Sequence, residues 1–180
     1  PLLGSLSDNG GPTKTMLPAD SSPAVDAGIA NGLTADQRGL PRTVQRTFTL
    51  PPGGDGTDIG AVELQDGGLT GVQVKVKKNQ KANGKKVVVT VEAGADEDVK
   101  VTGSGSVKAG KAKAKLKKVT KTVAAGKLGK LKLVPKSKKD TKKLLDALDD
   151  GDKGKAKLKV DVVDPAGNKQ TKKPKVTLKG

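Results

Sequence analysis

The run from Lys155 to Val162 constrains the fold more than any other stretch of the chain. In this run every even-numbered residue is apolar and every odd-numbered residue is charged. Period two is the signature of a β-strand with one face in a core and the other in water. The alternation returns in residues 173–178, after the segment 164–168, in which Pro and Gly favour a tight turn. The pattern therefore predicts a β-hairpin.

Charge divides the chain into two parts. Residues 1–66 carry four basic and eight acidic side chains, so the net charge of +16 implies +20 on the remaining residues. A hydrophobic content of 33%, with 24 Gly and 10 Pro, suits thin β layers joined by many turns. The difference in net charge between the two parts of the chain predicts two modules. We expect a first module over residues 1–66, a Gly-rich linker over 67–71 and a lysine-rich β-sandwich over 72–180.

The second module shows regularly spaced strand signals, which favour an antiparallel, immunoglobulin-like sandwich. Asn83-Gly84 is a strong hairpin turn between the first two strands. The expected strands are 72–78, 85–93, 97–103, 111–120, 128–134, 154–164 and 169–178. The expected inward residues are Val72, Val74, Val76, Val87, Val89, Val91, Leu131, Leu133, Leu158, Val160 and Val162.

One helix is expected where the sandwich crosses from one sheet to the other. Asp140 is the predicted N-cap, and Leu144, Leu145 and Leu148 share one face of the helix. Gly151 is the predicted stop, because glycine readily takes the left-handed conformation that ends helices.

The first module is rich in turns, with short strands expected only at 24–28, 47–50 and 58–64. Its motifs, taken in order, resemble the C-terminal end of bacterial right-handed parallel β-helix repeat proteins of the choice-of-anchor type. The motifs are Pro-Leu-Leu-Gly at 1–4, Asp-Asn-Gly-Gly-Pro-Thr at 8–13, Ser-Pro-Ala-Val-Asp-Ala-Gly at 22–28, Asp-Gln-Arg-Gly with Pro-Arg at 36–42, and Asp-Ile-Gly-Ala-Val-Glu at 58–63.

This resemblance implies a β-helix cap over residues 1–66, an exported parent protein and a location outside the cell or at its surface. The β-helix body is then expected upstream of residue 1. The lysine-rich module resembles, by composition, the immunoglobulin-like modules that end many actinobacterial exported proteins.

The residue types in the chain exclude several kinds of chemistry. Cys and His are both absent, which removes thiolate metal sites, disulfides and the usual general base. The carboxylates Asp26, Asp36, Asp58 and Glu63 allow a glycosidase-type pair, but each adjoins a turn, which favours bonds to backbone amides instead. The acidic run 149–152 lacks the spacing of a Ca²⁺ loop, and no helix follows Gly-Ser-Gly-Ser at 103–106 to make a phosphate loop. We predict no catalytic, cofactor-binding or metal-binding residue and no enzyme.

The lysines are the remaining functional signal. They suit either weak binding of anionic polymers or solvated strand faces protected from edge-to-edge aggregation. Arg38, Arg42 and Arg46 all lie in the first module, and the second has no aromatic residue for stacking on bases, so specific nucleic-acid recognition is not expected. No apolar run approaches the length of a transmembrane helix.

The sequence thus predicts a non-catalytic stalk or surface-association module of an exported bacterial protein. Two alternatives stay open: an accessory tail of a polysaccharide lyase or hydrolase whose active site lies upstream, and a non-specific polyanion-binding module.

Overall fold

The protein is mainly β, as the sequence predicted, and it divides into two compact units. The computed structural model describes residues 2–82 and 85–180. The first unit comprises residues 1–68 with the turn 165–167, and the second comprises 69–164 and 168–180. The predicted turn at Asn83-Gly84 lies outside the described residues.

The first unit is built from turns and isolated bridges. Within its described residues there is no helix and no strand, so the strands predicted at 24–28, 47–50 and 58–64 are wrong. The reason lies in the backbone. Asp26 has a φ of 56°, which interrupts an extended conformation, and many N–H groups bind carboxylates instead of a neighbouring strand. Single antiparallel bridges join Leu3 to Pro18, Ser7 to Thr15, Gly28 to Thr57 and Ala35 to Pro41.

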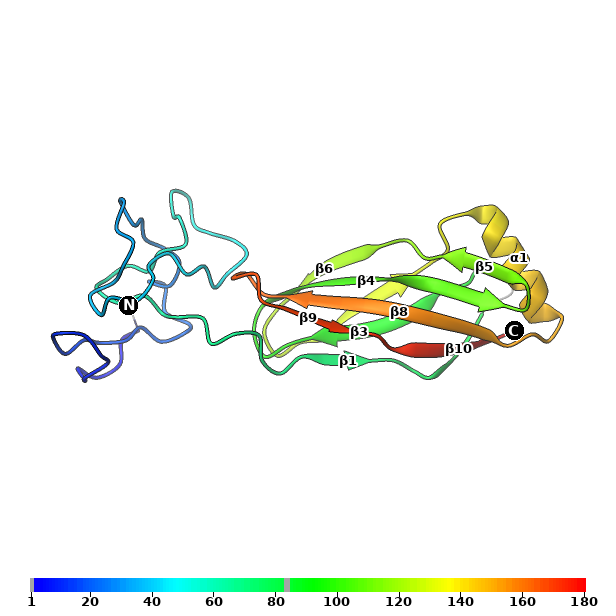
Figure 1. The fold of residues 1–180 in the computed structure, drawn as a ribbon, viewed down its shortest axis with the longest axis horizontal. Helices are drawn as coiled ribbons and strands as arrows, with labels where there is room; N and C mark the ends of the chain where they lie inside the picture. Colours follow the sequence, from blue (N-terminus) through cyan, green and yellow to red (C-terminus); the bar gives the residue numbers. More distant parts are fainter. Residues whose placement is uncertain (1, 83–84) are drawn as a thin grey trace. The chain divides into compact units, whose positions relative to one another are not determined.

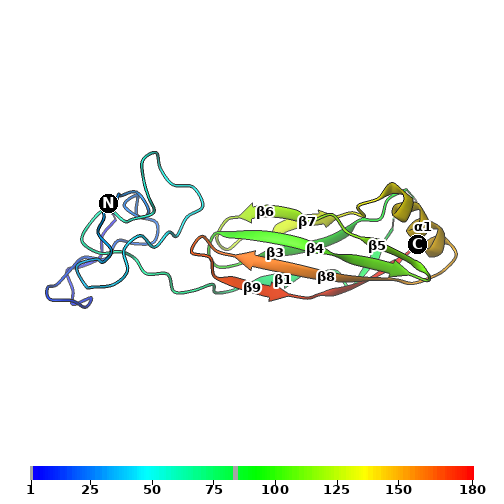
Figure 2. The same ribbon diagram turned by 45° about the horizontal axis from the view of Figure 1, so that its top comes forward.

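The second unit consists of two facing sheets and one helix, visible as two layers in Figures 1 and 2. One sheet has the order β1-β3-β7, from the strands Gln73–Lys75, Val89–Gly94 and Gly129–Leu133. The other has the order β2-β10-β8-β4-β5, from Asn79–Lys81, Lys175–Lys179, Gly154–Val163, Val99–Ala109 and Ala112–Lys115. In addition, β6 (Val119–Val123) pairs with β4, and β9 (Lys169–Lys172) pairs with β8.

The predicted hairpin is confirmed, with one change. Strand β8 pairs antiparallel with both β9 and β10, and Gly167 in the turn has a φ of 93°. The expected second strand, 169–178, is split at Pro174, because proline has no N–H to donate to the ladder. Its carbonyl still accepts the N–H of Leu158 at 3.0 Å, so the chain stays beside β8 across the break.

The core lies between the two sheets and follows the predicted alternation. Val160 is fully buried, whereas Lys159 is exposed. The valines of the first predicted strand differ from expectation: Val72, Val74 and Val76 are only half-buried, because β1 is a short edge strand. The other predicted inward residues are all buried, namely Val87, Val89, Val91, Leu131, Leu133, Leu158, Val160 and Val162.

Helix α1 (Lys138–Asp149) joins β7 of one sheet to β8 of the other, as predicted. The predicted N-cap is wrong. Ser137 is the cap, and its hydroxyl accepts the N–H of Asp140 at 3.3 Å, because a cap side chain bonds an amide two or three residues ahead. Leu144 and Leu148 are buried, and Gly151 follows the helix with a φ of 89°.

The chain passes from the smaller sheet to the larger one between β1 and β2. After this crossing, the Gln80 side chain still forms hydrogen bonds with β3 of the smaller sheet. Strand β1 covers only the far end of β3, opposite Glu92–Gly94. At Thr90 the Gln80 side chain takes the place of a strand. Its Oε1 accepts the Thr90 N–H and its Nε2 donates to the Thr90 carbonyl, both at 2.8 Å. Strand β2 pairs in parallel with β10 of the other sheet.

Candidate functional site

The acidic residues that the sequence singled out are buried in the first unit, where they bind backbone amides. Asp58 Oδ1 accepts the N–H of Asp26, and its Oδ2 accepts the N–H of Leu64, both at 2.8 Å. Glu63 accepts the N–H groups of Val44 at 2.8 Å and Asp58 at 2.9 Å. The prediction that these carboxylates bond to backbone amides is therefore confirmed.

Asp26 and Asp36 follow the same rule. Asp26 accepts the N–H groups of Arg46 and Thr47. Asp36 accepts the N–H groups of Arg38, Leu40 and Glu63 and forms a 2.7 Å ion pair with the Arg38 guanidinium. Each carboxylate oxygen of Asp26 and Asp36 accepts a hydrogen bond from an N–H donor. These side chains therefore stabilise the unit by linking segments of its backbone.

Burial and hydrogen bonding act in opposite directions on these groups. Burial raises the pKa values of Asp58 and Glu63, and the backbone N–H groups offset this only in part. Burial also opposes ionisation of Asp36, but the hydrogen bonds from the Arg38 side chain and from three backbone amides outweigh it, so the pKa of Asp36 is lowered.

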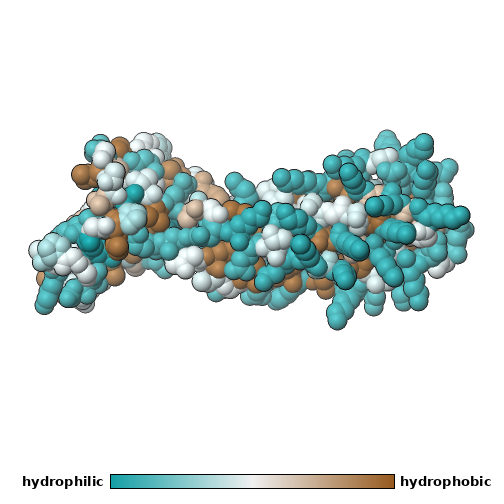
Figure 3. Space-filling model, in the orientation of Figure 1, coloured by the Kyte–Doolittle hydropathy of each residue, from teal (hydrophilic) through white to brown (hydrophobic). Residues whose placement is uncertain are grey.

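Six exposed lysines of the second unit lie on the outer face of the larger sheet, while other lysines lie on β1, β7 and α1. We call Lys108, Lys113, Lys115, Lys155, Lys157 and Lys175 the lysine face. They come from β4, β5, β8 and β10, and all six are exposed. The period-two pattern explains this, since alternate residues of neighbouring strands point to the same side. Figure 3 shows hydrophilic side chains projecting over this region.

Several lysines of this face stand directly opposite one another. Lys108 pairs across the ladder with Lys113 on one side and Lys155 on the other, and Lys157 pairs with Lys175. Like charges at opposed positions destabilise a sheet. Within the described part of the chain, none of the six forms an ion pair with a carboxylate. The acid on this face, Asp161, instead pairs with Lys159 and Lys169.

A shallow hollow of about 460 Å³ lies on the same side of the sheet. Ser104 and Ser106 of β4 lie in it, and Ser106 stands between Lys115 of β5 and Lys157 of β8. Short side chains flanked by long ones create the depression. Lys113, Lys118, Lys136, Lys159 and Lys173 complete its charged lining, which contains no carboxylate.

Sequence reasoning missed this hollow because it ended the strand at residue 103. Strand β4 continues to Ala109, and Val107 and Ala109 are buried. Gly105 allows this, because a Cβ there would collide with the Lys157 carbonyl oxygen of β8. The alternation of Ser104, Ser106 and Lys108 was the available signal. The Gly-Ser-Gly-Ser segment is thus the middle of a strand.

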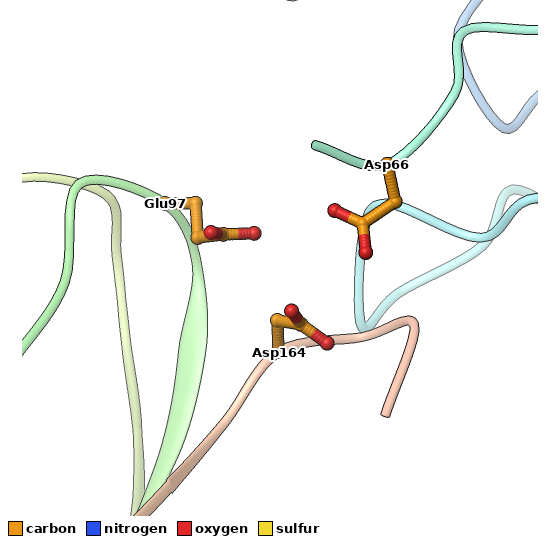
Figure 4. Close-up of side chains that lie close together, drawn as sticks. All are labelled: Asp66, Glu97 and Asp164. Carbon is orange, nitrogen blue, oxygen red and sulfur yellow. The ribbon is translucent and has the colours of Figure 1, made fainter. Parts of the chain in front are cut away.

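Acidic residues elsewhere in the second unit hold turns. Asp164 Oδ1 accepts the Asn168 N–H at 2.7 Å, and Glu97 Oε1 accepts the Thr70 N–H at 3.2 Å. Both appear in Figure 4, which also labels Asp66 of the first unit.

A comparison of the chain with protein-family models finds no match, and a search of curated protein sequences finds none either. Among the described residues, no helix has the length and apolar character needed to span a membrane.

Proposed function

We propose that the second unit is a non-catalytic surface-association module that binds anionic polymers on its lysine face. The observation that carries this proposal is the direct opposition of lysines, Lys108 with Lys113 and Lys155, and Lys157 with Lys175. A sheet designed only for stability would alternate charges at these positions. A polyanion laid across the face neutralises them and releases its own counterions, which favours binding.

The nature of the charged groups suggests a broad, weak interaction. A lysine ammonium is a compact, hydrated charge on a flexible stem, so its contacts with an anionic polymer are diffuse and interchangeable. The buried carboxylates of the first unit support a non-catalytic role, because their oxygens are already engaged by backbone N–H groups.

Binding measurements on the full chain across a salt series test the proposal. The variant Lys108→Gln/Lys155→Gln removes two opposed charges. Lys75→Gln/Lys132→Gln removes two exposed charges from the other sheet and serves as the matched control. For heparin, the slope of log affinity against log salt should fall by about 2 in the face variant and stay unchanged in the control. Equal losses in both variants would refute a localised face.

We also propose, from the resemblance of residues 1–64, that the first unit caps a parallel β-helix of an exported surface protein. The two-sheet arrangement with one crossing helix supports an immunoglobulin-like assignment for the second unit. The coding sequence upstream of residue 1 tests the first point, since β-helix repeats are expected there. An unrelated domain in that place would contradict it.

A further inference from the structure

The hollow beside Ser104 and Ser106 differs from other depressions of the second unit in its charge. The groove beside Gln80 includes Glu92 in its lining, and the depression between α1 and β5 includes Asp146, Asp150 and Asp152. Those carboxylates offset nearby lysines. The lining of the serine hollow contains no carboxylate. Lys159 pairs with Asp161 outside it, whereas Lys113 and Lys115 of β5 and Lys157 of β8 have no ion pair among the described residues.

The serine hydroxyls add hydrogen-bond donors to this charge. Ser104 and Ser106 are half-buried, and within residues 2–82 and 85–180 neither hydroxyl has a hydrogen-bond partner. Hydroxyls on the neighbouring part of the same face are already engaged. Thr102 bonds to Thr120 at 3.0 Å, and Thr171 donates to Asp161 at 2.6 Å. The two serines therefore present free donors inside a cationic hollow.

The spacing of these donors suits one class of anion. Residues two apart on a strand lie roughly 6.7 Å apart, so an anion between the two serines has room to accept a bond of about 2.7 Å from each. Esterified phosphate and sulfate groups present several acceptor oxygens in a tetrahedral arrangement, whereas a carboxylate presents two in one plane. Lys115 and Lys157 flank Ser106 and supply the opposite charge.

We propose that the hollow is a binding site for tetrahedral oxyanions, the phosphate or sulfate groups of an anionic polymer. Ser104 and Ser106 donate hydrogen bonds, and Lys115 and Lys157 neutralise the charge. The proposal rests on the polyanion-binding function of the lysine face and adds a preference among polymers, which diffuse lysine contacts alone do not provide.

The test compares three polymers of matched charge on the full chain: polyphosphate, dextran sulfate and polyglutamate. The variant Ser104→Ala/Ser106→Ala changes no charge, and Thr177→Val, on the same sheet face, is the control. Loss of two neutral hydrogen bonds should weaken binding of polyphosphate, dextran sulfate or both about tenfold. Polyglutamate affinity should stay within about twofold, and which tetrahedral polymer is affected tells phosphate from sulfate.

An equal loss for all three polymers, or no loss for either tetrahedral polymer, overturns the oxyanion site and leaves the proposed function standing. Failure of all three polymers to bind the wild-type chain overturns both proposals. Amide chemical shifts at residues 104–106 provide a second readout. They should move with polyphosphate or dextran sulfate and stay in place with polyglutamate.

Discussion

Asp58 of the first unit and Leu131 of the second are equally buried, each about 1% exposed, but they stabilise their units in different ways. Leu131 stabilises its unit by removing apolar surface from water, alongside a cluster of valines and leucines from both sheets. Asp58 stabilises its unit by accepting backbone N–H groups that no strand partner satisfies. In the second unit the backbone amides are paired in ladders around an apolar interior, whereas in the first unit several amides without a strand partner bond to buried carboxylates.

The apolar interior of the second unit and the hydrogen-bonded carboxylates inside the first unit should respond differently to substitution. In the second unit, Val160→Asp should lower the free energy of unfolding by several kcal/mol, because an unpaired charge enters an apolar interior. Lys159→Ser should stay within roughly 0.5 kcal/mol, as surface changes usually do. Denaturant melts of the full chain measure both, and similar effects would mean that the register of β8 is inverted.

In the first unit, Asp58→Asn should cost about 1–3 kcal/mol, because the new NH₂ group must face a backbone N–H that had an acceptor. Hydrogen exchange should accelerate at the amides of Asp26 and Leu64, while the amides of β8 keep their protection. The exposed Asp8→Asn is the control. Equal acceleration in both units would show that they unfold as one.

Gln80 tests the same principle within the second unit, since a side chain there replaces a strand. Gln80→Ala leaves the Thr90 N–H and carbonyl without these partners and should cost about 1–2 kcal/mol. Gln73→Ala, on the exposed side of β1, should have a negligible effect on the same denaturant melt. If Gln80→Ala leaves the free energy of unfolding unchanged, then water replaces the side-chain amide at this edge of the sheet.

The pH dependence of the first unit is the smallest expected effect, and two residues should shift it in opposite directions. Glu63 has its pKa raised from 4.5 by burial, so its contribution to stability is present below pH 4.5 and is lost as the pH rises through the raised value. Asp36 has its pKa lowered from 3.8, so its contribution is present above pH 3.8 and is lost as the pH falls through the lowered value.

Hydrogen exchange of first-unit amides between about pH 3 and pH 7 separates the two residues, after correction for intrinsic exchange. Relative to Glu63→Gln, the wild type should lose stability as the pH rises. Relative to Asp36→Asn, it should gain stability. A substitution can also change the stability by an amount that does not depend on pH, and such an amount does not affect the slope of the stability difference against pH. Slopes of the same sign would contradict the pKa directions.

The sequence predicted the second unit better than the first because its information is local and periodic. Alternation in residues 155–162 was sufficient to predict the strand and its buried face, and the turn 164–168 with the second alternating run was sufficient to predict the hairpin. In the first unit the strand candidates were too short for periodicity to have meaning. The partners of Asp58 and Glu63 are 5 to 32 residues away, in no repeating pattern.

The sequence alone was sufficient to predict that Lys155, Lys157 and Lys159 face the solvent, since the side-chain period of a strand is a property of the backbone. The order of the strands became known from the three-dimensional structure. That order places Lys108 against Lys155, encloses Ser106 between Lys115 and Lys157, and brings Gln80 to Thr90. Strand order depends on contacts between residues distant in the chain, and no local pattern records it.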